Sequence, residues 1–554
     1  MLLTGGEIVV QALKKEGVDT VFGYPGGAAL PMYDALYGSD IRHILTRHEQ
    51  GAVHAADGYA RATGKVGVCF STSGPGATNL ITGIATANMD SIPLVCITCQ
   101  VASSLLGKDS FQEADVSGIT TPITKHNYMV TDVNILTKVL SEAFYIARSG
   151  RPGPVVIDIP KDIFSQTAEF EYPEKVQMKS YCPVEEGDPA AVEEVAKALA
   201  EAKRPLLFVG GGVVLSDMEE AFAQILHKTG APFISSLMGL GSIDKSKPLY
   251  LGMVGMHGTY AANLAVTNCD LLIGFGVRFD DRVTGEVSKF APNAKIAHFE
   301  IDSSEINKIV KVDYKVLGDL RWSLPLFNSL VKPCDVDPWI EQVKGWKQEH
   351  PLHYTDESPR LKPQKVIEEV CRAMADDAII VTDVGQHQMW SAHYCRSTRK
   401  RGFLTSGGLG TMGYGLPAAI GAKLGCPDNE VWLFSGDGSI MMNCQEIATA
   451  MEEQLPIKVF ILNNHGLGMV RQWQRFFYEG RYSHSKHMAP TDFRRLAEAF
   501  DATGITVRER NELDAAIAAA KVCPSPIFVD VWVDDDENVL PMVAPNEALD
   551  NLVE

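Results

Sequence analysis

Short apolar, β-branched runs alternate with longer amphipathic segments along almost the whole chain. A short run of this kind predicts a buried strand, and an apolar period of about 3.6 residues predicts a helix between two strands. Their alternation favours parallel sheets covered by helices. The predicted strands are 21–23, 41–46, 66–70, 94–98 and 155–159, then 205–209, 232–234, 271–275 and 296–301, and finally 379–382, 431–434, 459–462 and 527–531.

The pattern is interrupted twice by polar, proline-containing stretches, which divide the chain into three blocks. A length of 554 residues agrees with this division, since a domain takes roughly 150 residues. We therefore expect three doubly wound α/β domains, and the similar layout of the first and third blocks favours two related folds that flank a middle one. The predicted boundaries are 1–165, a linker at 166–189, 190–332, a second linker at 333–362, 363–545 and a tail at 546–554.

Charge and composition limit the partners and the compartment. The 50 lysine and arginine residues against 69 aspartate and glutamate residues leave a net charge of −19, which repels phosphate backbones and anionic lipid. We expect no nucleic-acid partner and no membrane association, because no apolar run approaches the roughly 18 residues of a membrane span. The first residues lack the pattern of a signal peptide, so we expect a soluble, cytoplasmic protein. The 11 cysteines, Cys96 and Cys99 included, lie mostly in apolar runs and are expected to be reduced.

The chemistry of the chain is indicated by the ends of two neighbouring predicted strands. Strand 431–434 runs into Gly436-Asp437-Gly438, and strand 459–462 ends in two asparagines, the second of which is Asn464. In a right-handed βαβ unit both strand ends lie at one edge of the sheet, so the carboxylate and the amide oxygen converge. Such oxygens, with backbone carbonyl and phosphate oxygens, suit Mg²⁺ bound to a diphosphate. The alternative is that the two motifs are unrelated turns, but their position directly after two neighbouring strands disfavours it.

This GDG and NN pair resembles the thiamine diphosphate binding motif, and nearly the whole chain resembles the catalytic subunit of the acetohydroxyacid synthase family, also called acetolactate synthases. The resemblance rests on further motifs at 22–27, 47–52, 72–79, 150–155, 278–285, 385–390 and 468–473. It implies a first domain that binds the pyrimidine, a middle domain that binds FAD without redox use, and a third domain that binds the diphosphate and Mg²⁺. The 278–285 stretch is the feature that separates the chain from the FAD-free catabolic acetolactate synthases.

The resemblance implies decarboxylation of pyruvate on thiamine diphosphate and transfer of the hydroxyethyl group to a second pyruvate or to 2-oxobutyrate. The products would be 2-acetolactate or 2-aceto-2-hydroxybutyrate, in the first common step of valine, leucine and isoleucine biosynthesis. By the same resemblance Glu49 hydrogen-bonds N1′ of the aminopyrimidine and promotes loss of the thiazolium C2 proton. Met412 would be the apolar wedge that bends the cofactor, and Trp473 would contact the second substrate. The positions that match the family's substrate channel are Phe111, Gln112 and Lys161.

The resemblance also assigns the ligands of each cofactor. The implied metal ligands are Asp437, Asn464 and Gly466. The residues implied at thiamine diphosphate are Pro25, Glu49, Gly385, Gln386, His387, Gly410, Met412, Gly436, Asp437, Gly438, Ser439, Asn464, Gly466 and Met469. The residues implied at FAD are Arg151, Gly210, Gly211, Gly212, Met256, His257, Gly276, Arg278, Asp280, Arg282, Glu300, Ile301 and Asp319.

Two other interpretations stay open from the residues alone. Gly408, Gly410 and Gly413 match the dinucleotide fingerprint before a helical segment, which would suit a flavin- or nicotinamide-dependent oxidoreductase, in particular a flavin-dependent pyruvate oxidoreductase of the same cofactor family. The second interpretation is a non-catalytic regulatory or scaffolding α/β protein. A zinc site of the H-E-x-x-H type at His48 is excluded, because Ala52 stands where the second histidine belongs.

The resemblance has consequences for assembly as well. Glu49 and Asp437 would act on opposite ends of one cofactor from different chains, so the active unit would be a homodimer or a homotetramer of catalytic subunits. A separate small regulatory subunit is also implied.

Overall fold

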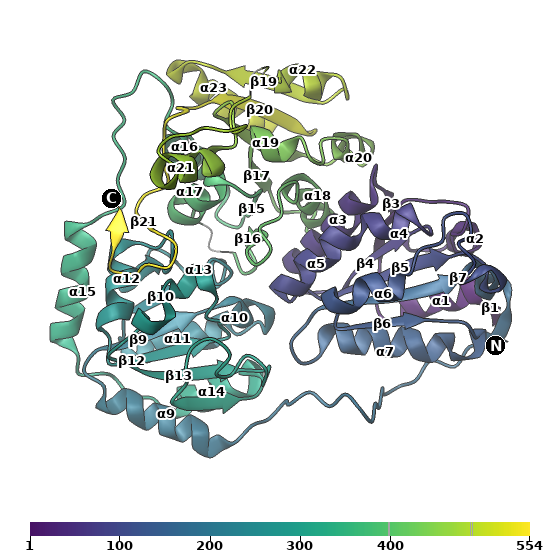
Figure 1. Cartoon of the computed structure of the whole chain (residues 1–554), viewed down its shortest axis with the longest axis horizontal. Helices are drawn as coiled ribbons and strands as arrows, with labels where there is room; N and C mark the ends of the chain where they lie inside the picture. The colour runs from purple at the N-terminus through teal and green to yellow at the C-terminus, as the bar shows by residue number, and fades with distance from the viewer. Residues whose placement is uncertain (397–398, 488, 490, 554) are drawn as a thin grey trace.

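Three six-stranded parallel sheets form the framework of the chain in the computed structural model, which describes residues 1–396, 399–487, 489 and 491–553. Successive residues of the central strands face opposite apolar clusters, as Leu94 and Val95 do in the first sheet and Leu433 and Phe434 in the third. Each sheet is therefore covered on both faces, which confirms the predicted doubly wound α/β fold. Figure 1 shows the first unit at the right, the middle unit at the lower left and the third unit at the top.

The first unit has the strand order β3-β2-β4-β5-β7-β6. Its strands are β2 (Thr20–Gly23), β3 (Arg42–Leu45), β4 (Gly67–Ser71), β5 (Leu94–Gln100), β6 (His126–Met129) and β7 (Pro154–Pro160). Its helices are α1 (Gly5–Lys15), α2 (Leu30–Leu36), α3 (Glu49–Thr63), α4 (Pro75–Asn79), α5 (Ile81–Asp90), α6 (Val116–Thr120), α7 (Leu136–Arg148) and α8 (Lys161–Ser165). A short antiparallel pair, β1 (Leu2–Thr4) with β8 (Thr167–Glu169), ties the start of the unit to its end.

The third unit repeats this topology. Its order is β16-β15-β17-β18-β20-β19, so both sheets place their second strand at one edge and their fifth at the other. The strands are β15 (Ile379–Thr382), β16 (Phe403–Leu404), β17 (Val431–Gly436), β18 (Ile457–Asn463), β19 (Thr503–Val507) and β20 (Ile527–Trp532). The helices are α16 (Pro363–Ala373), α17 (Gln386–Tyr394), α18 (Gly415–Gly425), α19 (Asp437–Ile440), α20 (Glu446–Glu452), α21 (Gly468–Phe477), α22 (Phe493–Glu498) and α23 (Leu513–Val522). The predicted relation of the first and third blocks is confirmed at the level of strand order.

The middle unit has a different order, β11-β10-β9-β12-β13-β14. The chain therefore builds outward from β9 in one direction and then from β12 in the other, and this reversal leaves a crevice beyond the ends of β9 and β12. Its strands are β9 (Pro205–Val209), β10 (Phe233–Ser235), β11 (Tyr250–Met253), β12 (Leu271–Phe275), β13 (Lys295–Glu300) and β14 (Tyr314–Leu317). Its helices are α9 (Pro189–Glu201), α10 (Gly211–Leu215), α11 (Glu219–Thr229), α12 (Tyr260–Asn268), α13 (Asp281–Thr284), α14 (Leu320–Leu330) and α15 (Asp337–Glu349).

Two stretches predicted as a linker and a tail differ from that prediction. The 333–362 stretch contains α15, whose Trp339 is buried against the middle unit and donates its indole N–H to the Pro205 carbonyl at 3.0 Å. The 546–554 stretch contains β22 (Leu552–Val553), which pairs with β21 (Met542–Val543). Leu549 is buried in the same apolar cluster as Trp339. Each stretch carries a few large apolar side chains among many charges, and burial of those few side chains fixes it on the middle unit.

The first and third units are joined by close packing of α3 against α18. A Cβ on Gly421 would lie 1.8 Å from the carbonyl oxygen of Ala55, and a Cβ on Gly58 would lie 2.2 Å from that of Ala418. The two helix backbones therefore touch, which only glycine permits at these positions. This contact places the two related sheets in one fixed arrangement.

A buried ion network lies beside this helix pair. The Arg61 guanidinium pairs with Asp57 and, at 2.8 Å, with Asp90, and all three side chains are almost wholly buried. Arg61 also donates to the Thr405 carbonyl at 2.9 Å. Asp90 accepts the backbone N–H of Gly408 at 2.7 Å. The first unit thus holds the loop that follows β16 in the third unit.

The structure also bears on membrane insertion and on the state of the cysteines. None of the helices among the described residues has the length and apolar character needed to span a bilayer. All eleven cysteines are free. Cys96 and Cys99 are buried on opposite faces of β5, where each packs into a separate apolar cluster.

Replacement of Arg61 by Met should lower the free energy of unfolding by about 3–5 kcal/mol, because it leaves two buried carboxylates without their cation. The matched control is Lys65→Met, since Lys65 pairs with Asp19 and its side chain is 52% exposed. That change should cost at most about 1 kcal/mol. Thermal unfolding of the two variants measures both effects, and equal shifts of the midpoint would contradict the account of the network.

Candidate active site

The ends of β17 and β18 place a carboxylate and an amide at one edge of the third sheet. The two strands are parallel neighbours, and Gly436 lies opposite Leu462. Asp437 follows β17 as the first residue of α19, and Asn464 follows β18. Asp437 is buried and accepts the backbone N–H groups of Gly438 and Gly466, and burial raises the pKa of its carboxyl to about 7. Asp437 and Asn464 therefore lie at one edge of the sheet, as the sequence predicts. The oxygens of their side chains suit a hard cation.

His387 lies between the ends of β15 and β17, with its ring within 3.0 Å of where a Cβ on Gly436 would stand. The ring is buried, and its Nε2 has no hydrogen-bond partner among the described residues. Burial lowers the pKa of the imidazole to about 3, so the ring is neutral. A buried ring nitrogen without a partner costs free energy unless a ligand meets it. A phosphate oxygen or a substrate hydroxyl would satisfy His387, so the residues present fit an anionic, hydroxyl-bearing ligand.

Gln386 connects these strand ends to distant segments. Its Nε2 donates to Gln472 at 2.9 Å and to the Glu537 carbonyl at 3.0 Å, while its Oε1 accepts from Asn464 at 3.3 Å. The side chain is therefore committed to protein partners. The part of Gln386 left for a diphosphate is its backbone N–H, which belongs to the unpaired first turn of α17.

A cavity of about 1430 Å³ lies where the three units meet. Most of the residues predicted at FAD line it: Arg151, Gly211, Gly212, Met256, His257, Gly276, Arg278, Asp280, Arg282, Glu300, Ile301 and Asp319. Gly210 is not among its lining residues but caps α10 directly before Gly211. From the set predicted at thiamine diphosphate or the second substrate, the lining residues are Gly385, Gly410, Met412, Met469 and Trp473.

The floor of the cavity is the crevice beyond β9 and β12. Gly276 follows β12 with a φ of +58°, and a Cβ there would lie 2.5 Å from the Cα of Gly212. The two chain segments touch, so no side chain stands between them and a ligand can approach both backbones. Glu300 ends the next strand, and its Oε1 accepts the backbone N–H of Asp302 at 3.0 Å. This arrangement of turns and acid is the one that adenine dinucleotides use.

The far wall of the cavity is apolar and comes from α21. Met469 and Trp473 face the cavity, and the Arg282 guanidinium lies 5.8 Å from the centre of the Trp473 ring. Met412 also lines the cavity, and its Cε lies 3.6 Å from where a Cβ on Gly438 would stand. One end of the cavity therefore combines an alkyl-binding surface with a cation, which suits a small 2-ketoacid.

The residues predicted for the pyrimidine end and for the substrate channel are not brought to this cavity. Pro25, Glu49, Gln112 and Lys161 all belong to the first unit and do not line it. Glu49 is buried as the first residue of α3 and accepts from Asn79 at 2.9 Å. Asp437 and Asn464, which were predicted for the metal, do not line the cavity either. Phe111, which was also predicted for the substrate channel, is 88% exposed.

The loop that matches the dinucleotide fingerprint has a different structural use. Gly408 and Gly413 donate their backbone N–H groups to carboxylates, Asp90 at 2.7 Å and Asp383 at 2.9 Å. Amides that already bind carboxylates are not a phosphate cradle, so the fingerprint interpretation of this loop is wrong. The loop matches the fingerprint only because it contains glycines, and these let the backbone approach the two carboxylates.

Sequence reasoning missed several polar residues of this site. Asp383 follows β15, is fully enclosed, and fixes the loop that carries Met412; burial raises the pKa of its carboxyl to about 6. His487 Nε2 lies 3.5 Å from Asp437 Oδ2. Asp383 comes directly after a predicted strand, and that position was a usable signal. His487 carries no such signal, because the loop that brings it back to Asp437 has no periodic pattern.

Comparison with known proteins agrees with this geometry. Models of thiamine pyrophosphate enzymes match the chain in three parts: the N-terminal TPP binding domain at 3–119, the central domain at 192–326 and the C-terminal TPP binding domain at 383–531. The acetolactate synthase large subunit of Corynebacterium glutamicum is 49% identical over 98% of this chain and 88% of its own length. In Escherichia coli, the acetolactate synthase isozyme 3 large subunit is 46% identical over 100% of this chain and 98% of its own. The isozyme 2 large subunit is 45% identical over 100% of both chains.

Replacement of Asp437 by Asn should weaken Mg²⁺ binding by roughly two orders of magnitude, because it removes the charge of a ligand to a dication. Binding of thiamine diphosphate, followed by tryptophan fluorescence over a range of Mg²⁺ concentrations, measures this effect. Asp428→Asn, at an exposed turn, is the matched control. A wild-type Mg²⁺ dependence in Asp437→Asn would remove this residue from the metal site.

Proposed function

The chain belongs to the acetolactate synthase family of thiamine diphosphate-dependent enzymes in branched-chain amino acid biosynthesis, and we propose how its residues carry out this reaction. The substrates are pyruvate as donor and either a second pyruvate or 2-oxobutyrate as acceptor. The observation that carries this proposal is the set of groups at the ends of β15, β17 and β18, where Asp437, Asn464 and His387 converge. The Nε2 of His387 has no partner in the part of the chain that the structure describes.

Each end of the cofactor meets its own group of residues. When bound, thiamine diphosphate supplies a carbon nucleophile at the thiazolium C2 and an electron sink for decarboxylation. Asp437, Asn464 and the Gly466 carbonyl would hold Mg²⁺, which would anchor the diphosphate. Glu49 would hold a proton at N1′ of the pyrimidine and so make the amino group of that ring a base. Met412, beside Gly438, would support the thiazolium end of the cofactor.

The wall formed by α21 selects the acceptor and excludes water. Trp473 and Met469 offer an apolar surface for the alkyl group of the second ketoacid. Arg282, whose guanidinium lies 5.8 Å from the centre of the Trp473 ring, would supply a positive charge for the carboxylate of that ketoacid. An apolar wall favours carbon–carbon bond formation over protonation by water.

The remainder of the cavity suits FAD in a structural role. Its volume of about 1430 Å³ exceeds what two small ketoacids need. The strand order of the middle unit and the contact of Gly212 with Gly276 support an adenine dinucleotide there. Arg278 and Asp280 line the same space. We expect the flavin to take no redox part in the reaction.

The first unit offers an exposed surface for an active site shared between two copies of the chain. Two exposed aromatic side chains lie on loops after strands of the first sheet: Tyr24, after β2, and Phe111, after β5, are 41% and 88% exposed. Burial of these rings against a second copy would bring its Glu49 to the third unit of this chain, in a homodimer or a homotetramer. A separate small regulatory subunit is supported by the names of the similar proteins, which are large subunits. The cytoplasmic location stays a prediction.

The proposed reaction is tested by supplying pyruvate, thiamine diphosphate and Mg²⁺, with and without an artificial electron acceptor. We expect 2-acetolactate and CO₂ at the same rate in both cases, because no electrons leave the substrates. Strict dependence on the acceptor would instead show a flavin-dependent pyruvate oxidoreductase. Absence of any turnover, with thiamine diphosphate bound, would indicate a non-catalytic protein.

Replacement of Glu49 by Gln should slow hydrogen–deuterium exchange at the thiazolium C2 by a factor of about 10²–10⁴, because Gln cannot hold a transferable proton at N1′. Exchange is followed by NMR on acid-quenched samples, and the thermal unfolding midpoint shows whether the fold is intact. Unchanged exchange in Glu49→Gln would remove this carboxyl from the mechanism.

A further inference from the structure

Gln472 is a fully buried amide on α21, next to Trp473 in the chain. Its Oε1 accepts from the backbone N–H of Val539 at 2.8 Å and from Nε2 of Gln386 at 2.9 Å. Its Nε2 donates to the Val539 carbonyl at 3.0 Å. The donor and acceptor ends of a backbone cannot exchange, so Val539 decides which end of the Gln472 amide carries the oxygen.

The position of that oxygen in turn orients Gln386. The Nε2 of Gln386 lies between two acceptors, Gln472 Oε1 and, at 3.0 Å, the Glu537 carbonyl. Its Oε1 must therefore face the other way, where it accepts from Asn464 Nδ2 at 3.3 Å. The Val539 backbone therefore sets the orientation of the Gln472 amide, Gln472 sets that of Gln386, and Gln386 sets that of Asn464.

The orientation of Asn464 matters because only one end of its amide can bind a cation. The carbonyl oxygen is a ligand for Mg²⁺, whereas the NH₂ group presents hydrogens that repel it. Since Nδ2 is committed to Gln386, Oδ1 is the atom left for a cation beside Asp437.

We propose that Gln472 is a positioning residue of the cation site, because it holds Gln386 in the orientation that presents the Asn464 oxygen. This inference rests on the proposed function, of which the cation is a part. Gln472 would touch neither the cation nor the diphosphate, so its effect is on the geometry of the ligands that do.

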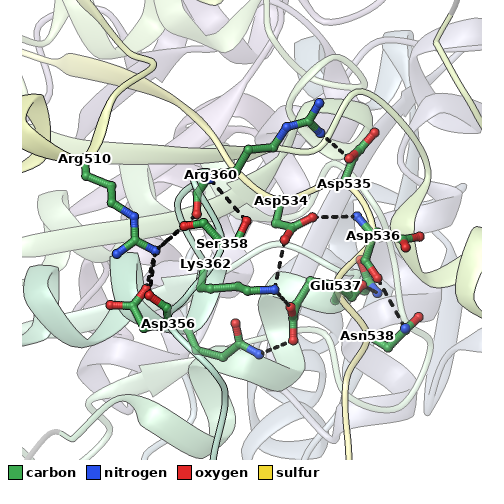
Figure 2. A network of polar contacts seen from close by, with 12 residues as sticks. Asp356, Ser358, Arg360, Lys362, Arg510, Asp534, Asp535, Asp536, Glu537 and Asn538 are labelled. Carbon is green, nitrogen blue, oxygen red and sulfur yellow. Dashed lines mark hydrogen bonds and ion pairs between the residues drawn. The ribbon is translucent and has the colours of Figure 1, made fainter.

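The segment 534–538, which carries the Glu537 carbonyl, is itself held in place by ion pairs. Lys362 pairs with Asp534 at 2.9 Å and with Glu537, and Gln364 donates to Glu537 Oε1 at 3.0 Å. Figure 2 shows these contacts within a wider network of charged side chains that joins this segment to the chain before α16. These contacts hold the segment that carries the Glu537 carbonyl, which is the acceptor on which Gln386 depends.

The first test is Gln472→Met, which keeps the length of the side chain but removes its hydrogen bonds. The dissociation constant of Mn²⁺, measured by the EPR signal of the free ion with thiamine diphosphate present and no substrate, should rise about 10–100-fold. The matched control is Gln342→Met on the exposed face of α15, which should leave this constant unchanged.

A second background separates orientation from packing. Asn464→Asp provides a carboxylate whose two oxygens are equivalent, so the ligand no longer depends on which way the group is turned. In that background Gln472→Met should change the Mn²⁺ constant by less than about threefold. If Gln472→Met does not fold, Gln386→Met breaks the same relay one step closer to Asn464 and carries the same expectation in both backgrounds.

Equal losses of Mn²⁺ affinity in the two backgrounds would overturn the inference, because Gln472 would then act through packing alone. Unchanged affinity in Gln472→Met would overturn it as well. Asp437→Asn distinguishes the failure of this inference from that of the proposed site. If Asp437→Asn loses Mn²⁺ while Gln472→Met does not, only the positioning inference fails; if neither loses it, the cation site itself is misplaced.

Discussion

The contact between α3 and α18 decides how the rest of the molecule is arranged. Because Gly58 and Gly421 let the two helix backbones touch, the first and third sheets cannot change their relative placement without separating a buried surface. The Arg61 network beside them carries this constraint to Asp90, which holds the loop after β16. That loop leads to Met412, so the packing of two helices determines the position of one wall of the cavity.

The same contact fixes where Glu49 lies relative to the third unit. Helix α3 begins at Glu49, and its packing on α18 commits the first unit to one side of the third. Asp437 and Asn464 lie at the carboxyl edge of the third sheet, and neither they nor Glu49 is among the residues that line the cavity, to which the first unit contributes residues such as Arg151. In the proposed dimer a second copy of the chain would supply the carboxyl of Glu49.

Central strands were predictable from the sequence because both of their faces are buried, which leaves a continuous apolar run; β9, β12 and β15 have the predicted bounds. Within the three six-stranded sheets, the strands that no run predicted are β6, β11, β14, β16 and β19, which include most of the sheet edges. Edge strands are short and often half exposed, so β14 and β19 carry mixed residues that match no period. The helix and strand in the predicted linker and tail had no clear signal for a related reason, since single side chains such as Trp339 anchor them.

The residues of the site also divide into those that the sequence could predict and those that it could not. Asp437 and Asn464 could be predicted because strand ends converge at one edge whatever the intervening sequence. The amides that orient them could not, since Gln386 meets Gln472 across 86 residues and Gln472 meets Val539 across 67. Such contacts depend on how α21 and the chain after β20 pack, which no local pattern encodes. Family resemblance supplied the roles of Glu49 and Trp473, which their positions in the sequence alone would not have indicated.

If each cofactor is held between two chains, as we propose, subunit exchange between two inactive variants should restore activity. Glu49→Gln and Asp437→Ala are mixed under conditions that let subunits exchange, and differently tagged chains confirm the exchange. If sites are shared, a mixed dimer has one doubly damaged site and one intact site. Activity should then return to about a quarter of the wild-type value, since about half of the dimers are mixed and half of their sites work. No recovery after confirmed exchange would show that both residues serve the cofactor of the same chain.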